Sequence, residues 1–305
     1  MGINSNHSNC PICKNTSASL ISRYYGTVTP FNKKVNRVVQ CNNCSLAYLV
    51  PIPDQIELNR FYSSYWVGET VVQSSSKESL EVYKAESFSR LSYLVNKIGS
   101  LKNKRILDFG AGHGLFGKAL NERGHDTSYY AVETDKEIVN GLKKEGINAA
   151  TKIEELNKKD FDIIVVFHVL EHVINPMEFI KFLIKYLKKG GVLFLEIPNK
   201  DYMFKKLFEP HVLFFNANSL DVLLNEFPFY DIEIVGCGRE LDNIPKERSM
   251  KKVFRRQIGN ILRLMGFRKK NSRDNNILNI EMIREIYEMD KLGRERQWLR
   301  AIAKK

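Results

Sequence analysis

The sequence predicts a doubly wound α/β fold, preceded by a small cysteine-rich module and followed by a helical C-terminal tail. Three observations predict this arrangement. Apolar, strand-like runs alternate with helical stretches from residue 105 to about residue 240, which is typical of a parallel sheet covered on both faces. The first of these runs leads into a loop with three glycines. Two Cys-x-x-Cys pairs stand within the first 50 residues, outside the alternating region.

Length and composition agree with a folded α/β protein. The 305 residues suffice for one full core and small accessory segments. With 43% apolar and 27% charged residues, the chain is neither disordered nor fibrous in composition. The first ten residues lack the pattern of a secretory signal, and no apolar run reaches the roughly 20 residues that span a bilayer. These features predict a cytoplasmic location, with peripheral contact to the inner membrane as a further option.

Shifts in pattern divide the chain into four segments. The predicted boundaries are a zinc-binding module at 1–50, a helical linker or lid at 51–100, the α/β domain at 101–244 and a basic helical tail at 245–305. Within the α/β domain, five strands are expected at Arg105–Phe109, Ser128–Glu133, Ile163–Phe167, Val192–Ile197 and Tyr230–Gly236, with helices between them.

The glycine loop predicts a nucleotide-like ligand. Gly110, Gly112 and Gly114 follow the first strand and precede a helix. Glycine lets the backbone turn sharply and approach a ligand closely, and the helix start presents unpaired N–H groups. Glu133 ends the next strand, at about the distance where dinucleotide-binding folds place the carboxylate that accepts the ribose hydroxyls. The alternating glycines lack the wider Gly-x-x-Gly step of the NAD fingerprint.

With Asp108 in front of it, this loop reads Asp-x-Gly-x-Gly-x-Gly and resembles the first motif of class I, S-adenosylmethionine-dependent methyltransferases. Three later segments, 161–173, 187–199 and 211–224, resemble the fourth strand, the fifth strand and the element before the last strands of that family. Because these similarities occur in the right order over residues 105–240, the resemblance implies a Rossmann-like methyltransferase sheet.

The resemblance also implies a cofactor, S-adenosylmethionine, and the residues that would bind it. The methionine end is assigned to residues 108 and 110–112, the ribose to residue 133, the adenine to residue 134 and the sulfonium to residues 167 and 168. In full, the expected cofactor-binding residues are Asp108, Gly110, Ala111, Gly112, Glu133, Thr134, Phe167 and His168.

The cysteine pairs predict a structural zinc site. Cys10 and Cys13 form one Cys-x-x-Cys pair, and Cys41 and Cys44 form the other. A two-residue spacer lets both thiolates of a pair bind one ion, so two pairs complete a tetrahedral set. A disulfide interpretation fits a cytoplasmic chain poorly, and a thioredoxin-like site needs only one pair.

The stretch from Val39 to Tyr48 and the prolines that follow it resemble bacterial methyltransferases that join such a module to the catalytic domain. These include C-methyltransferases of deoxysugar nucleotides and enzymes of surface-polysaccharide biosynthesis. The resemblance implies methyl transfer to a hydroxyl or carbon of a sugar, either in a nucleotide sugar or in a surface glycan. Two alternatives remain: an RNA methyltransferase, and a non-catalytic zinc-dependent scaffold.

Two histidines are candidate catalytic residues. His168 stands where the fourth strand of the family ends, and His211 lies in a loop expected to line the substrate site. An imidazole suits proton transfer near neutral pH, although capping or packing are alternative roles. The segment from His168 to His172 also resembles quinone-biosynthesis O-methyltransferases, in which a Glu-x-x-Glu-His group can hold a divalent ion. Here His168 replaces the first of those glutamates.

Positive charge is concentrated in one segment. Residues 246–273 contain eleven basic residues and one acid, so they carry a net charge of +10 out of +12 for the whole chain. Apolar residues at near-helical spacing lie among these charges, and such a helix could contact an anionic membrane surface or a phosphate-bearing substrate; a packing helix with solvated lysines is the alternative. Because the charge avoids the cofactor loop, the pattern argues against nucleic acid as a partner. The oligomeric state is not predicted.

Overall fold

The computed structural model describes residues 9–24, 36–59, 77–204, 211–243 and 295–305. The strands are β1 (Ala18–Tyr24), β2 (Asn36–Cys41), β3 (Ala47–Val50), β4 (Lys104–Phe109), β5 (Thr127–Val132), β6 (Asn148–Ala150), β7 (Phe161–Phe167), β8 (Leu187–Pro198), β9 (Leu213–Phe214), β10 (Tyr230–Glu240) and β11 (Arg296–Lys304). The α-helices are α2 (Lys77–Ile98), α3 (Leu115–Glu122), α4 (Lys136–Lys144), α5 (Pro176–Ile184) and α6 (Ala217–Asn225). Short 3-10 helices are η1 (Ile153–Leu156), η2 (Leu170–His172), η3 (Asp201–Met203) and η4 (Leu241–Asn243).

The larger sheet has seven strands in the order β10-β11-β8-β7-β4-β5-β6. Strands β4 to β8 run parallel, and β11 is antiparallel to both β8 and β10. The chain first builds outward from β4 through β5 to β6, and then returns to β7 on the other side of β4. In open α/β sheets, ligands bind outside the carboxyl ends of the strands at such a reversal. A ligand is therefore expected at the loops that follow β4 and β7.

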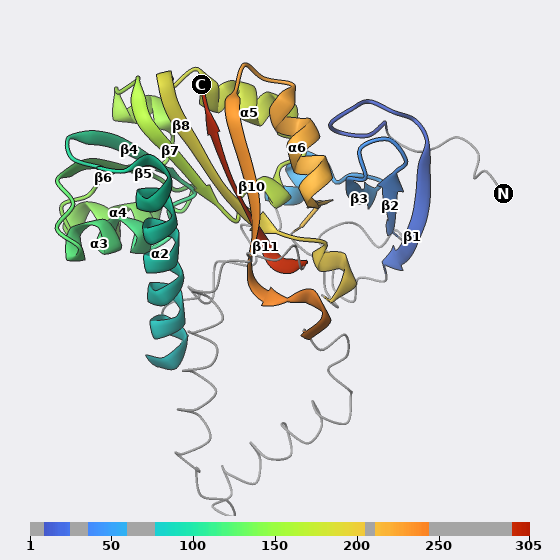
Figure 1. Ribbon diagram of the computed structural model, residues 1–305, viewed down its shortest axis with the longest axis horizontal. Helices are drawn as coiled ribbons and strands as arrows, with labels where there is room; N and C mark the ends of the chain where they lie inside the picture. The colour runs from blue at the N-terminus through green and yellow to red at the C-terminus, as the bar shows by residue number, and fades with distance from the viewer. Residues whose placement is uncertain (1–8, 25–35, 60–76, 205–210, 244–294) are drawn as a thin grey trace, which may run out of the picture.

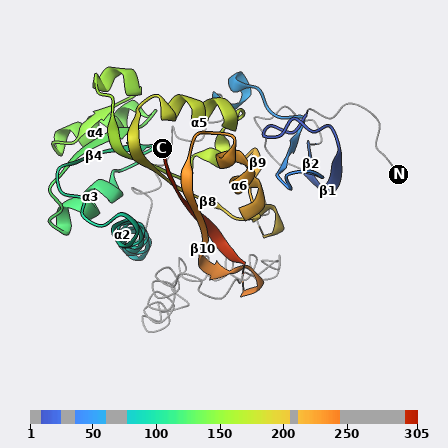
Figure 2. The same ribbon diagram turned by 45° about the horizontal axis from the view of Figure 1, so that its top comes forward.

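Helices cover both faces of this sheet, as Figures 1 and 2 show. Apolar residues of α2 and α3 pack with one set of strand side chains, among them Leu94, Phe116 and Ile163. Apolar residues of α5 and α6 pack with the alternate set, among them Leu183 and Ile164. Every residue of β7 is buried, as expected for a central parallel strand that has no polar face.

The helix starts follow from local sequence. The Asp135 side chain accepts hydrogen bonds from the N–H groups of Glu137 and Ile138 at the start of α4. Asn175 caps α5 and is followed by Pro176, whose missing N–H costs nothing at a first helical position. Helix α3 differs, because it begins after Gly114 without any side-chain cap. Its first N–H groups are thus left for another acceptor.

A second, smaller sheet carries the cysteines. Its strand order is β1-β2-β3-β9, and each neighbouring pair is antiparallel. The first three strands belong to the N-terminal module, whereas β9 comes from the loop between β8 and α6. In Figure 1 this sheet lies beside α6. The module and the larger domain therefore share a strand.

The structure confirms the predicted α/β architecture and changes several boundaries. All five expected strands are present as β4, β5, β7, β8 and β10, with β8 and β10 longer than expected. The expectation of a helical tail is wrong for residues 296–304, because they form β11 inside the sheet. The basic segment 246–273 lies outside the described residues. No described helix combines the length and the apolar character that crossing a membrane requires.

Candidate active site

The loop after β4 is shaped by its glycines. Gly110 has φ +80°, and a Cβ there would lie 2.3 Å from Cγ2 of Val169, so a larger residue is excluded on two grounds. Gly112 has φ +51°, but a Cβ there would meet no atom within 4 Å. The loop is therefore tightly packed at Gly110 and open at Gly112, where a ligand can approach the backbone.

Glu133 joins the glycine loop to the end of β5. Its Oε2 accepts a hydrogen bond from the Gly112 N–H (2.9 Å), and its Oε1 accepts one from the Thr134 N–H (2.7 Å). These bonds place Glu133 and Thr134 beside residues 110–112, as the sequence predicts. The carboxylate is half-buried and Thr134 is exposed. One edge of the sheet thus presents a carboxylate, an exposed hydroxyl and a glycine backbone together.

Asp108 lies beneath this loop at the end of β4. It is buried, and Oη of Tyr129 donates a hydrogen bond to its Oδ2 (2.6 Å). Burial raises the pKa of Asp108 to about 7, although the Tyr129 hydrogen bond and the charge of Arg90 oppose the rise. A buried carboxyl that titrates near neutral pH is typical of functional sites.

The end of β7 brings a strained histidine to the same edge. His168 has φ +55°, a left-handed conformation that costs a residue other than glycine about 1 kcal/mol or more. Its N–H donates to the carbonyl of Glu196 (2.8 Å). Phe167, in contrast, points into the core, where its ring packs edge-on against Phe116 and Phe194. Of the two residues expected at the sulfonium, only the His168 side chain faces the open edge.

Three imidazoles surround one carboxylate oxygen. Oε1 of Glu171 lies 3.5 Å from Nδ1 of His168, 3.7 Å from Nε2 of His172 and 4.0 Å from Nε2 of His211. Burial raises the pKa of Glu171, but the charge of His172 and the contact with His168 outweigh it and lower the pKa to about 2. The carboxylate is therefore ionised at neutral pH.

The contacts of His168 raise its pKa. Burial lowers the pKa of His168, but its contacts with Glu171 and Glu196 outweigh that effect and raise the pKa to about 9. His168 is therefore an imidazolium at neutral pH and cannot accept a proton. A catalytic role for His168 stays a prediction, and its positive charge favours positioning over proton acceptance.

His211 has the arrangement of a general base. It is buried, and its Nδ1 lies 2.6 Å from Oδ2 of Asp201 on η3. This contact fixes the tautomer in which Nδ1 carries the proton and Nε2 the lone pair. Nε2 then faces the Glu171 cluster, at the carboxyl end of β7.

His168 contacts a buried ion cluster that is centred on Glu196. Glu196 on β8 is fully buried and pairs with Arg90 of α2 (2.6 Å) and with Nε of Arg300 on β11 (2.6 Å). Burial raises the pKa of Glu196, but the two guanidinium charges outweigh it and hold the pKa well below its usual range. Its Oε1 also lies 3.3 Å from Nε2 of His168. The cluster therefore ties α2, β8 and β11 to the end of β7.

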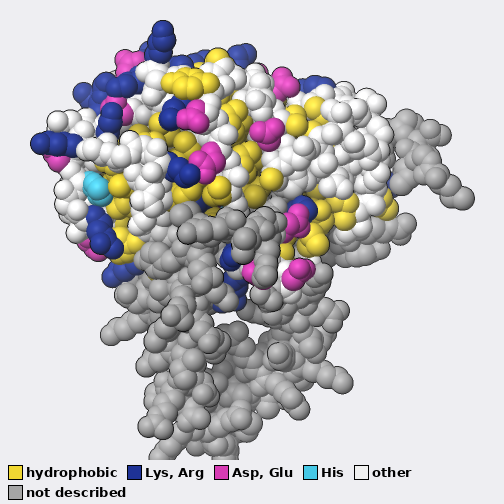
Figure 3. All heavy atoms as spheres, in the orientation of Figure 1, with side chains coloured by type: hydrophobic (Ala, Val, Ile, Leu, Met, Phe, Trp, Pro, Cys, Tyr) yellow, Lys and Arg dark blue, Asp and Glu magenta, His cyan; other side chains and the backbone are white. Residues whose placement is uncertain are grey.

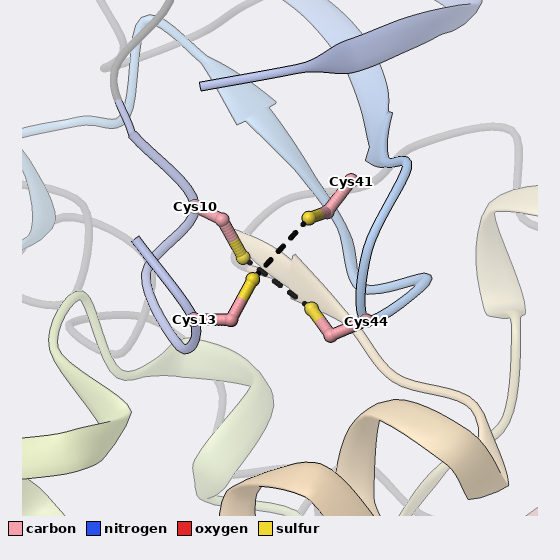
Figure 4. A group of neighbouring side chains, drawn as sticks. All are labelled: Cys10, Cys13, Cys41 and Cys44. Atoms are coloured by element: carbon pink, nitrogen blue, oxygen red, sulfur yellow. Dashed lines mark hydrogen bonds between the residues drawn. The ribbon is translucent and has the colours of Figure 1, made fainter. Parts of the chain in front are cut away.

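The four cysteines converge as the spacing predicts (Figure 4). The Sγ atoms of Cys10 and Cys44 are 3.5 Å apart, as are those of Cys13 and Cys41, and all four lie within 4.8 Å of one another. Four sulfurs around a tetrahedral zinc at about 2.3 Å would be about 3.8 Å apart. The Cys44 thiol lowers the pKa of Cys10 to about 5, so this sulfur is already a thiolate at neutral pH. The donor set fits a structural zinc ion.

The residues that contact Asp108, His168 and His211 or neutralise their partners are not predicted from the sequence: Arg90, Tyr129, Asp201, Glu196 and Arg300. One signal was available for Glu196. An acid within the apolar run Leu193–Pro198 requires a buried cation. Nothing near Asp201 in sequence indicates that it pairs with His211, because the two residues meet only through tertiary structure.

Comparisons with known proteins agree with this site. A family model described as "Methyltransferase domain" matches residues 83–234. A protein from Aliivibrio fischeri named ubiquinone biosynthesis O-methyltransferase is 27% identical over 128 residues, which are 38% of this chain and 54% of the relative. One of the same name from Rickettsia prowazekii is 32% identical over 139 residues, which are 41% of this chain and 54% of the relative. The chain thus spans about half the length of these curated relatives.

Similar solved structures are also methyltransferases. A SAM-dependent methyltransferase from Archaeoglobus fulgidus is 20% identical with a TM-score of 0.46, over 72% of this chain and 94% of that one. One from Thermotoga maritima is 19% identical with a TM-score of 0.47, over 81% of this chain and 98% of that one.

The family match spans the glycine loop, Glu133, the end of β7 and His211. It begins at residue 83, within α2, and so includes part of the segment expected to be a linker. The chain therefore carries a methyltransferase domain over residues 83–234, and this match assigns it to the enzymes.

Proposed function

We propose that the protein transfers the methyl group of S-adenosylmethionine to a hydroxyl or a carbon of a sugar, and that His211 removes the acceptor proton. One observation carries the proposal: a buried His211–Asp201 pair lies at the carboxyl end of β7, and the glycine loop follows the carboxyl end of β4, the parallel strand beside β7. The sugar is supported by the resemblance of the cysteine module to sugar-modifying enzymes.

In this site the cofactor, when bound, supplies an activated methyl group on a sulfonium. The residues of this chain supply position and proton transfer. Glu133 would accept hydrogen bonds from the ribose hydroxyls, and the open backbone at Gly112 would leave room for the ligand. His211 takes the acceptor proton at Nε2, and the resulting imidazolium is stabilised by Asp201 at 2.6 Å and by Glu171 at 4.0 Å. An aliphatic hydroxyl or a carbon acid needs such a base because it holds its proton tightly.

The acceptor class is tested with S-adenosylmethionine that carries a labelled methyl group. Purified protein is incubated with a panel of nucleotide sugars, glycan fragments and phenols, and the products are analysed by mass spectrometry. Label in a sugar product supports the proposal. Label only in a phenol would instead match the activity named for the ubiquinone-biosynthesis relatives, and would overturn the sugar assignment. Cofactor binding without turnover on any acceptor favours the scaffold.

The titration of Asp108 predicts a pH-dependent cofactor affinity. Without bound cofactor, the Asp108 carboxyl has a pKa of about 7. The ammonium group of the cofactor favours the ionised form of Asp108. Affinity for S-adenosylhomocysteine therefore rises from pH 6 to pH 7, by at most about tenfold per pH unit, and levels off above pH 7. Calorimetry at several pH values measures this, and Asp108→Asn should flatten the profile. An affinity that falls as the pH rises would contradict the assignment.

A second role for the histidine cluster is favoured by a specific observation. Neither oxygen of buried Glu171 accepts a hydrogen bond of good geometry from the described residues. Ligand atoms of Glu171, His172 and His211 lie within 4.8 Å of one another, and imidazole with carboxylate suits several divalent transition metals. An ion held there would polarise the acceptor oxygen. Metal analysis of purified protein, and turnover with and without chelator, decide between the ion and His211 as the means of proton removal.

The basic segment 246–273 is proposed to contact anionic lipid or a phosphate-bearing acceptor. On the face shown in Figure 3, Lys and Arg side chains lie mainly toward the upper left margin, with Asp and Glu among them and hydrophobic side chains across the middle. The protein should co-sediment with anionic vesicles at low salt and remain in the supernatant at high salt. If it does not bind the vesicles at low salt, the membrane contact is refuted.

A further inference from the structure

The strand that follows His211 is held by the cysteine module. Strand β9 pairs with β3, with Leu213 opposite Tyr48 and Phe214 opposite Ala47. The N–H of Leu49 also donates to the carbonyl of Val212 (3.1 Å). His211 is thus one residue from a backbone hydrogen bond to the module, and two from its sheet.

The start of α6 is attached to the module at a second place. Nδ2 of Asn218 donates to the carbonyl of Cys44 (2.9 Å), and Nδ2 of Asn216 donates to the carbonyl of Ser45 (2.7 Å). Both acceptors lie in the turn between β2 and β3, where the Ser45 N–H donates to the carbonyl of Cys41 (3.0 Å). The turn that brings Cys41 and Cys44 together is therefore the turn that α6 contacts.

The opposite side of this segment leads to the histidine cluster. The N–H of Val212 donates to the carbonyl of Glu171 (2.9 Å). Residues 212–215 are almost completely buried, in the same apolar core as Cys10 and Leu46. The segment is therefore a short rigid connection between the cysteine turn and the catalytic edge.

We propose that the metal-closed cysteine module positions His211 for proton transfer, through the β3–β9 pairing and the Asn218–Cys44 hydrogen bond. This inference rests on the proposed role of His211. The four thiolates close the turn at residues 41–46, the turn fixes β3 and the start of α6, and these fix the segment that begins at His211. Among the described residues, no hydrogen bond joins the module to Glu133 or to the glycine loop at the ends of β5 and β4, so we expect cofactor binding to be independent of the closure.

The first experiment measures backbone exchange in the full-length protein. Cys13 is the least buried of the four ligands, so Cys13→Ser removes zinc with the smallest change in packing. Hydrogen–deuterium exchange of a peptide covering residues 212–216 should accelerate at least about tenfold relative to the zinc-loaded protein, because β9 loses its partner strand. A peptide covering β7 should be unchanged. Equal exchange at residues 212–216 in the two proteins overturns the proposal.

The second experiment leaves the zinc ligands intact. Asn218→Ala deletes one of the two side chains that bond to the cysteine turn and leaves the Asn216–Ser45 hydrogen bond in place. Asn225→Ala is the matched control, because Asn225 lies in the same helix and, within the part of the chain that the structure describes, its side chain donates to the carbonyl of Asp221 rather than to the module. With normal zinc content, Asn218→Ala should lower kcat by roughly five- to tenfold, since small displacements of a catalytic group cost that much or more. The KM for S-adenosylmethionine should stay within twofold.

The outcomes separate the two claims. If Asn218→Ala has the same kcat as Asn225→Ala while both bind S-adenosylhomocysteine normally, the positioning role is refuted and the methyltransferase function stands. If the unmodified protein binds no S-adenosylhomocysteine, the proposed function itself fails. An equal loss of kcat and of cofactor affinity in Asn218→Ala would indicate general destabilisation, and would also overturn the positioning role.

Discussion

His211→Ala should lower kcat by about 100- to 10,000-fold, the usual contribution of a positioned general base. His211 Nε2 is the expected proton acceptor, because Asp201 occupies Nδ1 and because His168 is already protonated at neutral pH. Binding of S-adenosylhomocysteine should stay within about twofold, since His211 lies outside the glycine loop. Steady-state kinetics with the acceptor and calorimetry with the cofactor product measure the two quantities separately.

Two further variants make the result specific. Asp201→Asn keeps the shape of the pair but removes the charge that stabilises the imidazolium, so kcat should fall by a smaller factor than in His211→Ala. His125→Ala alters a histidine in the loop after α3, away from the site, and should match the unmodified protein. Retention of more than a tenth of kcat in His211→Ala would show that another group removes the proton.

Glu196→Gln should have the largest effect on stability. The substitution keeps the size of the side chain but removes the carboxylate that Arg90 and Arg300 share, and leaves Arg90 the longer contact with Glu86 (3.9 Å). Breaking a buried pair in this way typically costs about 3–5 kcal/mol, because an uncompensated charge remains in the core. Urea denaturation should show a lower midpoint with an unchanged slope if the folded structure is otherwise retained.

A surface ion pair provides the control for this measurement. Glu233 pairs with Lys97 at 2.5 Å, and both side chains are more than a third exposed. Exposed pairs contribute about 0–1 kcal/mol, so Glu233→Gln should change the free energy of unfolding by no more than that. If Glu196→Gln were equally mild, the Arg90–Glu196–Arg300 cluster would not hold α2, β8 and β11 together.

The sequence predicts those parts of the fold that are encoded locally. Strands β4 and β7 contain apolar runs. Glycine is required at position 110 because φ is positive there and because a Cβ would clash with Val169. The pairing of Glu133 with the loop follows from the order of β4 and β5 in a parallel sheet. The cysteine set follows from spacing alone, since two Cys-x-x-Cys pairs can complete one tetrahedral site.

Elements that depend on distant partners were not predictable in the same way. Residues 296–304 contain three basic side chains and resemble a polar tail. They form a strand because β8 and β10 pair with them on both sides and Glu196 neutralises Arg300. Strand β9 has two residues and exists only because β3 lies beside it. Such pairings are set by tertiary structure, which overrides local propensity.

The catalytic assignment shows the same limit. His168 and His211 are equivalent candidates in sequence, since both are histidines in loops near the expected site. The structure gives them different neighbours: Glu171 (3.5 Å) and Glu196 (3.3 Å) lie on the two ring nitrogens of His168, whereas His211 has Asp201 at 2.6 Å and Glu171 only at 4.0 Å. Neither set of neighbours is adjacent in sequence, apart from Glu171.

Binding of S-adenosylhomocysteine to the unmodified protein and to Glu133→Ala, measured by calorimetry, tests the central claim most directly. The claim is that the glycine loop and Glu133 form the cofactor site. The unmodified protein should bind one equivalent, and Glu133→Ala should bind about 10- to 100-fold more weakly, since charged hydrogen bonds contribute about 1.5–3 kcal/mol. Glu145→Ala, which alters a surface pair with Lys118, should bind normally. No binding to the unmodified protein, or equal affinity in Glu133→Ala, would contradict the account.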